Sequence, residues 1–97
     1  MSLNFFILGV ITMKQFDYTI TDELGIHARP AGELVKVAKE FSSAVKFDCN
    51  GKSADAKRLI AVMSLGAKQG HVVSVTVEGA DEDVAATKLE SFLKENL

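Results

Sequence analysis

Four stretches of the chain are predicted to be strands, and in the first two apolar and polar side chains alternate, which is the pattern of a strand with one buried face. In the first stretch Phe16 and Tyr18 alternate with charged or polar neighbours, and the last stretch is rich in β-branched valines, which favour a strand over a helix. An Asn50-Gly51 pair between the second and third stretches is typical of a type I′ hairpin, because both residues tolerate positive φ angles. The predicted strands are Lys14–Thr21, Ala44–Cys49, Lys52–Asp55 and His71–Glu78.

Two further segments carry apolar residues at intervals of three and four, which is the spacing of an amphipathic helix. The first begins at Ala28 or Arg29 and has Pro30 in its first turn, where the missing N–H of proline is no loss. The other begins after Asp81, whose side chain is expected to cap it. The predicted buried stripes are Ala31, Leu34, Val35, Ala38 and Phe41 in the first helix, and Ala85, Ala86, Leu89, Phe92 and Leu93 in the other.

The stretch from Arg58 to Leu65 is mostly apolar and ends before Gly66, which predicts a short helix with a glycine cap. The predicted order is therefore strand, helix, strand, strand, helix, strand, helix, or βαββαβα. All the helices need the same apolar face of the sheet to cover them. The sequence thus predicts an α+β fold in which a four-stranded antiparallel sheet has its helices on one face.

Length, composition and charge limit the kinds of protein that fit. The chain has 97 residues, of which 47% are hydrophobic and 25% charged, and this suits one domain with a single core. A net charge of -2 and a pI near 5.6 argue against nucleic-acid binding, which usually needs clustered Lys and Arg, so we expect protein partners. Cys49 is the only cysteine, which excludes an intramolecular disulfide and a cysteine-rich metal site. Two histidines without acidic or cysteine companions do not make a metal site, so we expect no metal. The chain shows no glycine-rich nucleotide loop, so we expect no cofactor.

The apolar segment Asn4–Thr12 fits none of these elements. It is shorter than the about 20 residues of a membrane helix, and no basic region precedes it as in a signal peptide, so we expect no membrane insertion. We interpret residues 1–12 as an N-terminal extension or an artefact of cloning or of the start site, with Met13 as the natural start and residues 13–97 as the folded domain. The alternative is an extra strand or an apolar plug against a neighbouring molecule, since exposed apolar runs are usually covered.

Residues 24–30, Leu-Gly-Ile-His-Ala-Arg-Pro, place His27 where the first helix is about to begin. Near neutral pH much of an imidazole is uncharged and nucleophilic, so it can accept a phosphoryl group. We expect the start of the helix to stabilise a phosphoryl group on His27, because N–H groups of a first turn lack partners inside the helix and can bind phosphoryl oxygens. The residues at this start are Ala28, Arg29 and Pro30. The motif therefore predicts a docking point for a phosphoryl group. Taken alone, it also fits a surface or helix-capping histidine without chemistry.

Three segments in register resemble the HPr family, the histidine-containing phosphocarriers of the bacterial sugar phosphotransferase system. They are Gly-Ile-His-Ala-Arg-Pro-Ala at 25–31, Asn-Gly-Lys at 50–52 and Val-Met-Ser-Leu-Gly at 62–66, and the resemblance covers about residues 14–96. It implies an open-faced β-sandwich and a cytoplasmic, monomeric carrier rather than a turnover enzyme. It also implies that His27 takes a phosphoryl group on Nδ1 from enzyme I and passes it to IIA domains of sugar transporters, while Arg29 helps to hold the phosphoryl charge.

The resemblance further implies a partner surface formed by the start of the first helix and by the short helix, here Leu59, Met63 and Leu65. The chain departs from the family at Arg58, where many members carry a serine that a dedicated kinase phosphorylates. An arginine can neither accept phosphate nor imitate it, so we expect a carrier without this serine switch. Two other functions stay open. One is a regulatory module of the same fold that binds transcription factors or enzymes without carrying phosphate, and the other is a small-ligand-binding domain, for which no pocket motif is apparent.

Overall fold

The computed structural model describes residues 13–97, which contain four strands and three helices in the predicted order. The expectations for residues 1–12 lie outside the described residues. The elements are β1 (Lys14–Thr19), α1 (Ala28–Lys39), β2 (Ala44–Cys49), β3 (Lys52–Asp55), α2 (Leu59–Ser64), β4 (Val72–Glu78) and α3 (Glu82–Asn96). Relative to the prediction, β1 ends earlier, β4 begins later and α2 is shorter at both ends.

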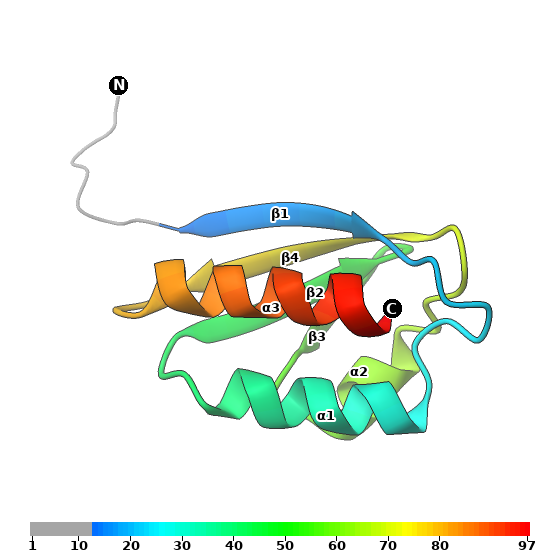
Figure 1. Cartoon of the computed structure of the whole chain (residues 1–97), viewed down its shortest axis with the longest axis horizontal. Coiled ribbons are helices and arrows are strands. Elements are labelled where there is room, and N and C mark those ends of the chain that lie inside the picture. Colours follow the sequence, from blue (N-terminus) through cyan, green and yellow to red (C-terminus); the bar gives the residue numbers. More distant parts are fainter. Residues whose placement is uncertain (1–12) are drawn as a thin grey trace.

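The strands form one antiparallel sheet in the order β1-β4-β2-β3 (Figure 1). β4 is an inner strand, and its Val75 lies opposite Phe16 of β1 on one side and Phe47 of β2 on the other. The predicted hairpin joins β2 to β3, and its residues Asn50 and Gly51 have φ angles of 54° and 79°. Positive φ at both positions is the property of a type I′ turn, so the hairpin prediction is confirmed.

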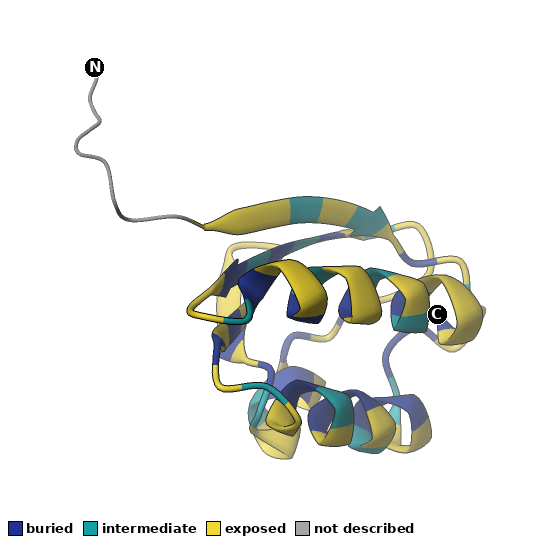
Figure 2. Ribbon diagram, turned by 60° about the vertical axis from the view of Figure 1, so that its left-hand side comes forward, coloured by how far each residue is buried: buried dark blue, intermediate teal, exposed yellow. Residues whose placement is uncertain are grey.

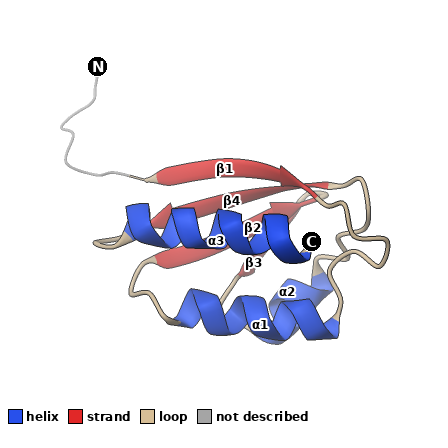
Figure 3. Ribbon diagram, in the orientation of Figure 1, coloured by secondary structure: helices blue, strands red, loops and turns tan. Residues whose placement is uncertain are grey.

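All three helices lie on the same face of the sheet, as Figures 1 and 3 show. Inward side chains of the inner strands are fully buried between the two layers, and Figure 2 shows that the helices carry their buried residues toward the interior. Fully buried side chains include Phe47, Val73, Val75 and Val77 of the strands and Leu34, Leu89 and Leu93 of the helices. Within the described residues no helix covers the opposite face of the sheet. The predicted α+β fold, an open-faced β-sandwich, is therefore confirmed.

The turn before α3 differs from the prediction that the Asp81 side chain caps this helix. Asp81 occupies the N-cap position, but its side chain makes no capping hydrogen bond. Its carboxylate accepts hydrogen bonds from the N–H groups of Ser42 and Ser43, both at 3.0 Å, and from the Ser43 hydroxyl. The capping prediction was wrong because the loop before β2 supplies three donors to the same carboxylate. Near this turn, the Gly79 N–H donates to Oε1 of the buried Glu82 at 3.1 Å.

These contacts make the stability of the fold depend on Asp81 and on pH. The Ser43 hydroxyl, followed by the Ser42 N–H, holds the pKa of Asp81 below its usual value. A carboxyl group with a lowered folded pKa stabilises the fold above its unfolded pKa of about 3.9, and this contribution is lost as the pH falls through the folded pKa. We therefore expect Asp81→Asn to lower the urea midpoint of unfolding at about pH 7 and to change it little once the carboxyl group of the parent is protonated.

Glu95→Gln is the control for this experiment, because Glu95 lies on the exposed side of α3. Its urea midpoint should match that of the parent chain across the same pH range. Equal midpoints for Asp81→Asn and the parent at neutral pH would contradict the role given to Asp81.

Candidate functional site

His27 is the N-cap residue of α1 and is partly exposed at the surface. Its backbone is extended, with φ -130° and ψ 178°, and its side chain makes no capping hydrogen bond. Its carbonyl oxygen accepts the first hydrogen bond of the helix, from the N–H of Ala31 at 2.9 Å. The backbone thus places the imidazole at the entrance of the helix, while the ring nitrogens take no part in capping.

Gly25 and Ile26 join the loop that carries His27 to the segment after α2. The Ile26 N–H donates to the carbonyl oxygen of Ala67 at 3.0 Å. Gly25 has a φ of +68°, and a Cβ atom added to it would lie 2.4 Å from the same oxygen. Only glycine combines this φ with so close an approach. Gly25 therefore sets the direction from which the chain enters His27.

The start of the same loop is bound to the end of the chain after α3. The N–H groups of Thr21 and Asp22 donate to a main-chain oxygen of Leu97 at 2.6 and 2.9 Å. The carboxylate of Asp22 in turn accepts the N–H of Leu24 at 2.8 Å. His27 therefore lies on a loop whose backbone is fixed on both sides, which sets the position of the His27 backbone while its side chain stays partly exposed.

The first turn of α1 offers backbone donors next to His27. The N–H groups of Ala28 and Arg29 precede the first hydrogen bond of the helix, so no helical carbonyl group can accept from them. Pro30 follows with no N–H to satisfy and is buried. The first turn contains no acidic residue, so the helix dipole and the Arg29 guanidinium both favour an anion at His27.

A shallow hollow of about 260 Å³ lies beside His27, and we call it the His27 hollow. It is lined by Asp22, His27, Arg29, Pro30, Glu33 and Asn96. The sequence prediction did not include Asp22, Glu33 or Asn96. The spacing of four residues between Arg29 and Glu33, which puts both on one face of a helix, was an available signal for Glu33. Nothing in the sequence pattern indicated that Asn96, at the far end of the chain, lies here.

The short helix α2 lies beside α1 and exposes apolar side chains (Figure 1). Leu59 and Met63 are each 39% exposed, and Ile60, which was not predicted to belong to this surface, is 78% exposed. Leu65 is only 2% exposed. Its placement on a partner surface was therefore wrong, because α2 ends before Leu65 and the chain then turns inward, so that Leu65 joins Val62 in the core.

The described residues offer neither a reactive thiol nor a cluster of metal ligands in addition to this site. Burial raises the pKa of the Cys49 thiol, which makes a reactive thiolate less accessible. Among residues 13–97 no three His, Cys, Asp or Glu side chains come together as a metal site would require. In the same range no helix has the length and apolar character needed to cross a bilayer.

The arrangement around His27 can bind an anionic group and release it again. Backbone donors and a guanidinium adjoin the imidazole, and the hollow is open enough for a partner to reach a group held there. The fold and the site together define a class of small proteins: an open-faced β-sandwich in which an accessible histidine at the N-cap of the first helix can carry an anionic group.

Comparisons with known proteins agree with this class. A family model described as the PTS HPr component phosphorylation site matches residues 14–95. The phosphocarrier protein HPr of Lysinibacillus sphaericus is 45% identical over 83 residues, which cover 86% of this chain and 94% of that protein. The structure of a histidine-containing phosphocarrier protein from Mycoplasma has a TM-score of 0.82 at 33% identity and covers 84% of this chain and 93% of its own. The structure of Crh, a catabolite repression protein of Bacillus subtilis, has a TM-score of 0.69 at 32% identity, covers 82% and 92% of the two chains, and is a swapped, intertwined dimer.

The chain therefore belongs to the HPr family, the phosphocarriers of the phosphotransferase system. This confirms the resemblance seen in the three sequence segments.

Proposed function

We propose that His27 accepts a phosphoryl group from enzyme I of the phosphotransferase system and passes it to IIA domains of sugar transporters. The observation that carries this proposal is the position of His27, an accessible imidazole at the N-cap of α1 with the Ala28 and Arg29 N–H groups and the Arg29 guanidinium beside it. Membership of the HPr family supports the same role. By analogy with the family, we assign the phosphoryl group to Nδ1.

Loading and delivery are then two displacements at phosphorus. In loading, the lone pair of the neutral Nδ1 attacks the phosphorus atom, a P–N bond forms, and the bond to the donor atom of enzyme I breaks with its electron pair returning to that atom. In delivery, an acceptor atom of the IIA domain attacks the same phosphorus, and the electron pair of the P–N bond returns to Nδ1. The other ring nitrogen keeps its proton throughout. Each step therefore conserves atoms and electrons and leaves His27 ready for the next cycle.

The strength of the site suits a carrier. A phosphoryl group brings roughly -1.5 to -2 charges, and a helix N-terminus stabilises an anion by about 0.3 to 2 kcal/mol, depending on its exposure. The His27 hollow is open to solvent, so its stabilisation lies toward the weaker end of this range. Such a site holds the group without trapping it, as repeated transfer requires.

We propose the apolar surface beside His27 as the docking face for both partners. Leu59, Ile60 and Met63 are exposed on α2, and Leu24 is 71% exposed on the loop before His27. Clustered exposed apolar side chains mark interaction sites, and a methionine adapts to several partners. We further propose that the chain works as a cytoplasmic monomer, while the related Crh forms a swapped dimer.

Arg58 lies at the N-cap of α2 and is exposed, at the position where many family members carry the regulatory serine. We propose that the serine switch is absent, because Arg58 offers no hydroxyl group to a serine kinase and its positive charge is opposite to that of a phosphoserine. Two nearby serines do not take its place: the Ser53 hydroxyl donates to Asp48, and the Ser64 hydroxyl donates to the Ala61 carbonyl oxygen at 2.7 Å. The regulatory-module alternative would have been favoured by a retained serine and a lost His27, and the chain shows the reverse.

Removing the guanidinium beside His27 tests the proposed function at its charge-stabilising group. We expect Arg29→Ala to slow phosphoryl transfer from enzyme I by roughly ten- to a hundredfold, since a hydrogen bond to a charged group contributes about 1.5 to 3 kcal/mol. The free energy of unfolding should change by less than about 0.5 kcal/mol, because exposed charges contribute little to stability. Rapid-quench measurement of phosphoryl transfer and urea unfolding give the two quantities.

Lys36→Ala is the matched control, since Lys36 is an exposed cation on α1 that does not line the His27 hollow. It should transfer at nearly the parent rate. Equal rates for Arg29→Ala and Lys36→Ala would remove Arg29 from the mechanism.

A further inference from the structure

Glu33 is one of two acidic residues that line the His27 hollow, and phosphoryl binding explains neither charge. It lines the hollow together with His27 and Arg29. A phosphoryl group is an anion, so a carboxylate beside it opposes its binding. A site that only had to hold the group would be stronger with a neutral or basic residue at this position.

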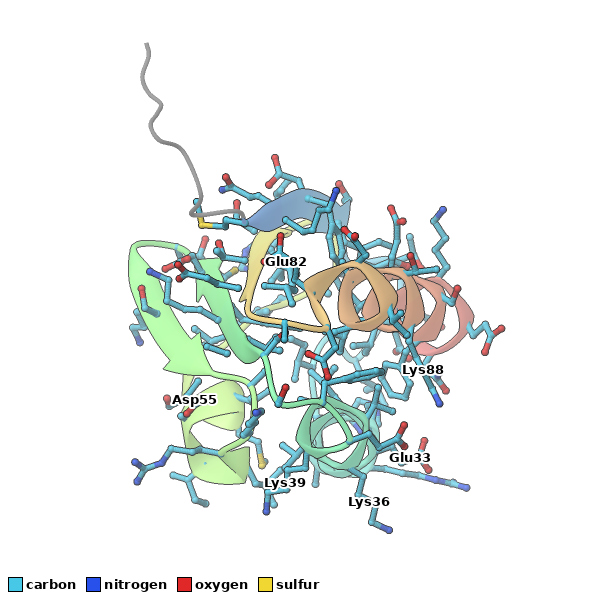
Figure 4. The ribbon with its side chains drawn as sticks, turned by 90° about the vertical axis from the view of Figure 1, so that its left-hand side faces the viewer. Glu33, Lys36, Lys39, Asp55, Glu82 and Lys88 are labelled. Atoms are coloured by element: carbon cyan, nitrogen blue, oxygen red, sulfur yellow. The ribbon has the colours of Figure 1, made fainter. Side chains whose placement is uncertain are left out.

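The position of Glu33 on α1 places its charge close to that of Arg29. The two residues are four apart in the helix, so their side chains leave the same helix face, with Cβ atoms about 5 to 6 Å apart. Figure 4 shows Glu33 projecting from α1 away from the sheet, as Lys36 and Lys39 also do. Glu33 is exposed, and within residues 13–97 its carboxylate takes part in no hydrogen bond or salt bridge. No structural contact of the described chain therefore accounts for this charge.

Asp22, the other acidic residue of the hollow, differs from Glu33 in this respect. Its carboxylate accepts the N–H of Leu24 at 2.8 Å, and its own N–H donates to Leu97. Asp22 thus has a structural role in the loop before His27. Glu33 is the acidic residue of this hollow whose charge can be removed without breaking such a contact.

We propose that Glu33 lowers the stability of the phosphoryl group on His27 and thereby favours its transfer to the acceptor. This inference rests on the proposed carrier function. The carboxylate repels the phosphoryl oxygens. It also attracts the Arg29 guanidinium one helical turn away, although the two form no salt bridge in the described residues, and this attraction weakens the hold of Arg29 on the phosphoryl oxygens. Both effects act in the same direction. Glu33 is a positioning residue: it sets how readily the phosphoryl group leaves His27 for the acceptor, and it does not itself react.

The test measures how phosphoryl groups divide between two chains at equilibrium. Isotope-labelled parent chain is loaded with phosphoenolpyruvate and enzyme I, the phosphoenolpyruvate is removed, and an equal amount of unlabelled Glu33→Gln is added with a catalytic amount of enzyme I for exchange. Intact-mass spectrometry then gives the phosphorylated fraction of each chain. We expect the phosphoryl group to favour Glu33→Gln by about three- to tenfold at low salt. The preference should shrink at about 1 M salt, where the screening length falls to about 3 Å.

Two control variants show whether the effect of Glu33→Gln comes from the loss of a negative charge at this position. Glu33→Asp keeps the carboxylate and should divide nearly evenly with the parent. Glu78→Gln removes the same charge from the end of β4, which lies away from the start of α1 (Figure 1), and should also divide evenly. Even division for Glu33→Gln at low salt, or an equal preference for Glu78→Gln, would overturn this inference and leave the carrier function intact. A parent chain that takes no phosphoryl group from enzyme I would instead overturn the carrier function and this inference together.

Discussion

Replacing His27 with alanine is expected to abolish phosphoryl uptake from enzyme I. The substitution removes the nucleophilic nitrogen, and the second histidine is not equivalent to it. His71 Nδ1 accepts the N–H of Lys68 at 3.0 Å and lies 3.1 Å from Nδ2 of Asn50, and no helix begins beside it. The His27 side chain does not cap α1, so the free energy of unfolding should change by less than about 0.5 kcal/mol. Mass spectrometry after incubation with phosphoenolpyruvate and enzyme I measures the uptake.

His71→Ala is the matched control for this experiment, since it removes an imidazole outside the His27 hollow. It should load as fully as the parent chain. An acid-labile phosphoryl group that persists in folded His27→Ala would show that another residue is the acceptor.

Gly25→Ala is expected to destabilise the chain and to displace His27. The left-handed φ of +68° disfavours a side chain by about 1 to 2 kcal/mol. The new Cβ would also lie 2.4 Å from the Ala67 oxygen and 2.8 Å from the Lys68 Cα, so the loop must move away from the hydrogen bond between Ile26 and Ala67. Loss of that bond adds about 0.5 to 1.5 kcal/mol. Urea unfolding should show the sum, and the NMR signals of the His27 ring should shift.

Gly66→Ala separates the two causes of lost stability, the strained backbone and the close contact with Ala67. Gly66 has nearly the same φ, +64°, but a Cβ atom there would meet nothing within 4 Å. This variant should lose only the about 1 to 2 kcal/mol of the strained backbone and leave the His27 signals unchanged. Equal losses of stability in the two variants would show that the close approach of Gly25 to Ala67 does not hold the loop.

Most of the fold could be predicted because its signals are local. Alternation in β1 and β2, the stripe of α1 and the Asn50-Gly51 turn each depend on neighbouring residues, and each appears in the structure, except that Phe41 of the predicted stripe lies beyond the end of α1 and is only partly buried. The capping prediction at Asp81 failed because of a contact with residues 38 and 39 positions earlier in the chain. The donors of Ser42 and Ser43 compete for its carboxylate, and local capping preference cannot show them.

The candidate site was predictable where it follows one helix and less so where several segments meet. His27 and Arg29 could be identified from the sequence because a nucleophilic imidazole directly precedes the helix and a cation lies in its first turn. Leu65 was misplaced because its surroundings depend on where α2 ends and the chain turns inward, which apolar character alone does not tell. Glu33 and Asn96 both line the His27 hollow because α1 packs against α3.

The most direct test of the central claim is NMR of the unaltered chain after loading with phosphoenolpyruvate and enzyme I. We predict a single phosphoryl group on Nδ1 of His27, together with large shifts of the Ala28 and Arg29 amide protons as they turn into donors to its oxygens. A phosphoryl group on another residue, or unmoved Ala28 and Arg29 amide signals in the loaded chain, would contradict the account.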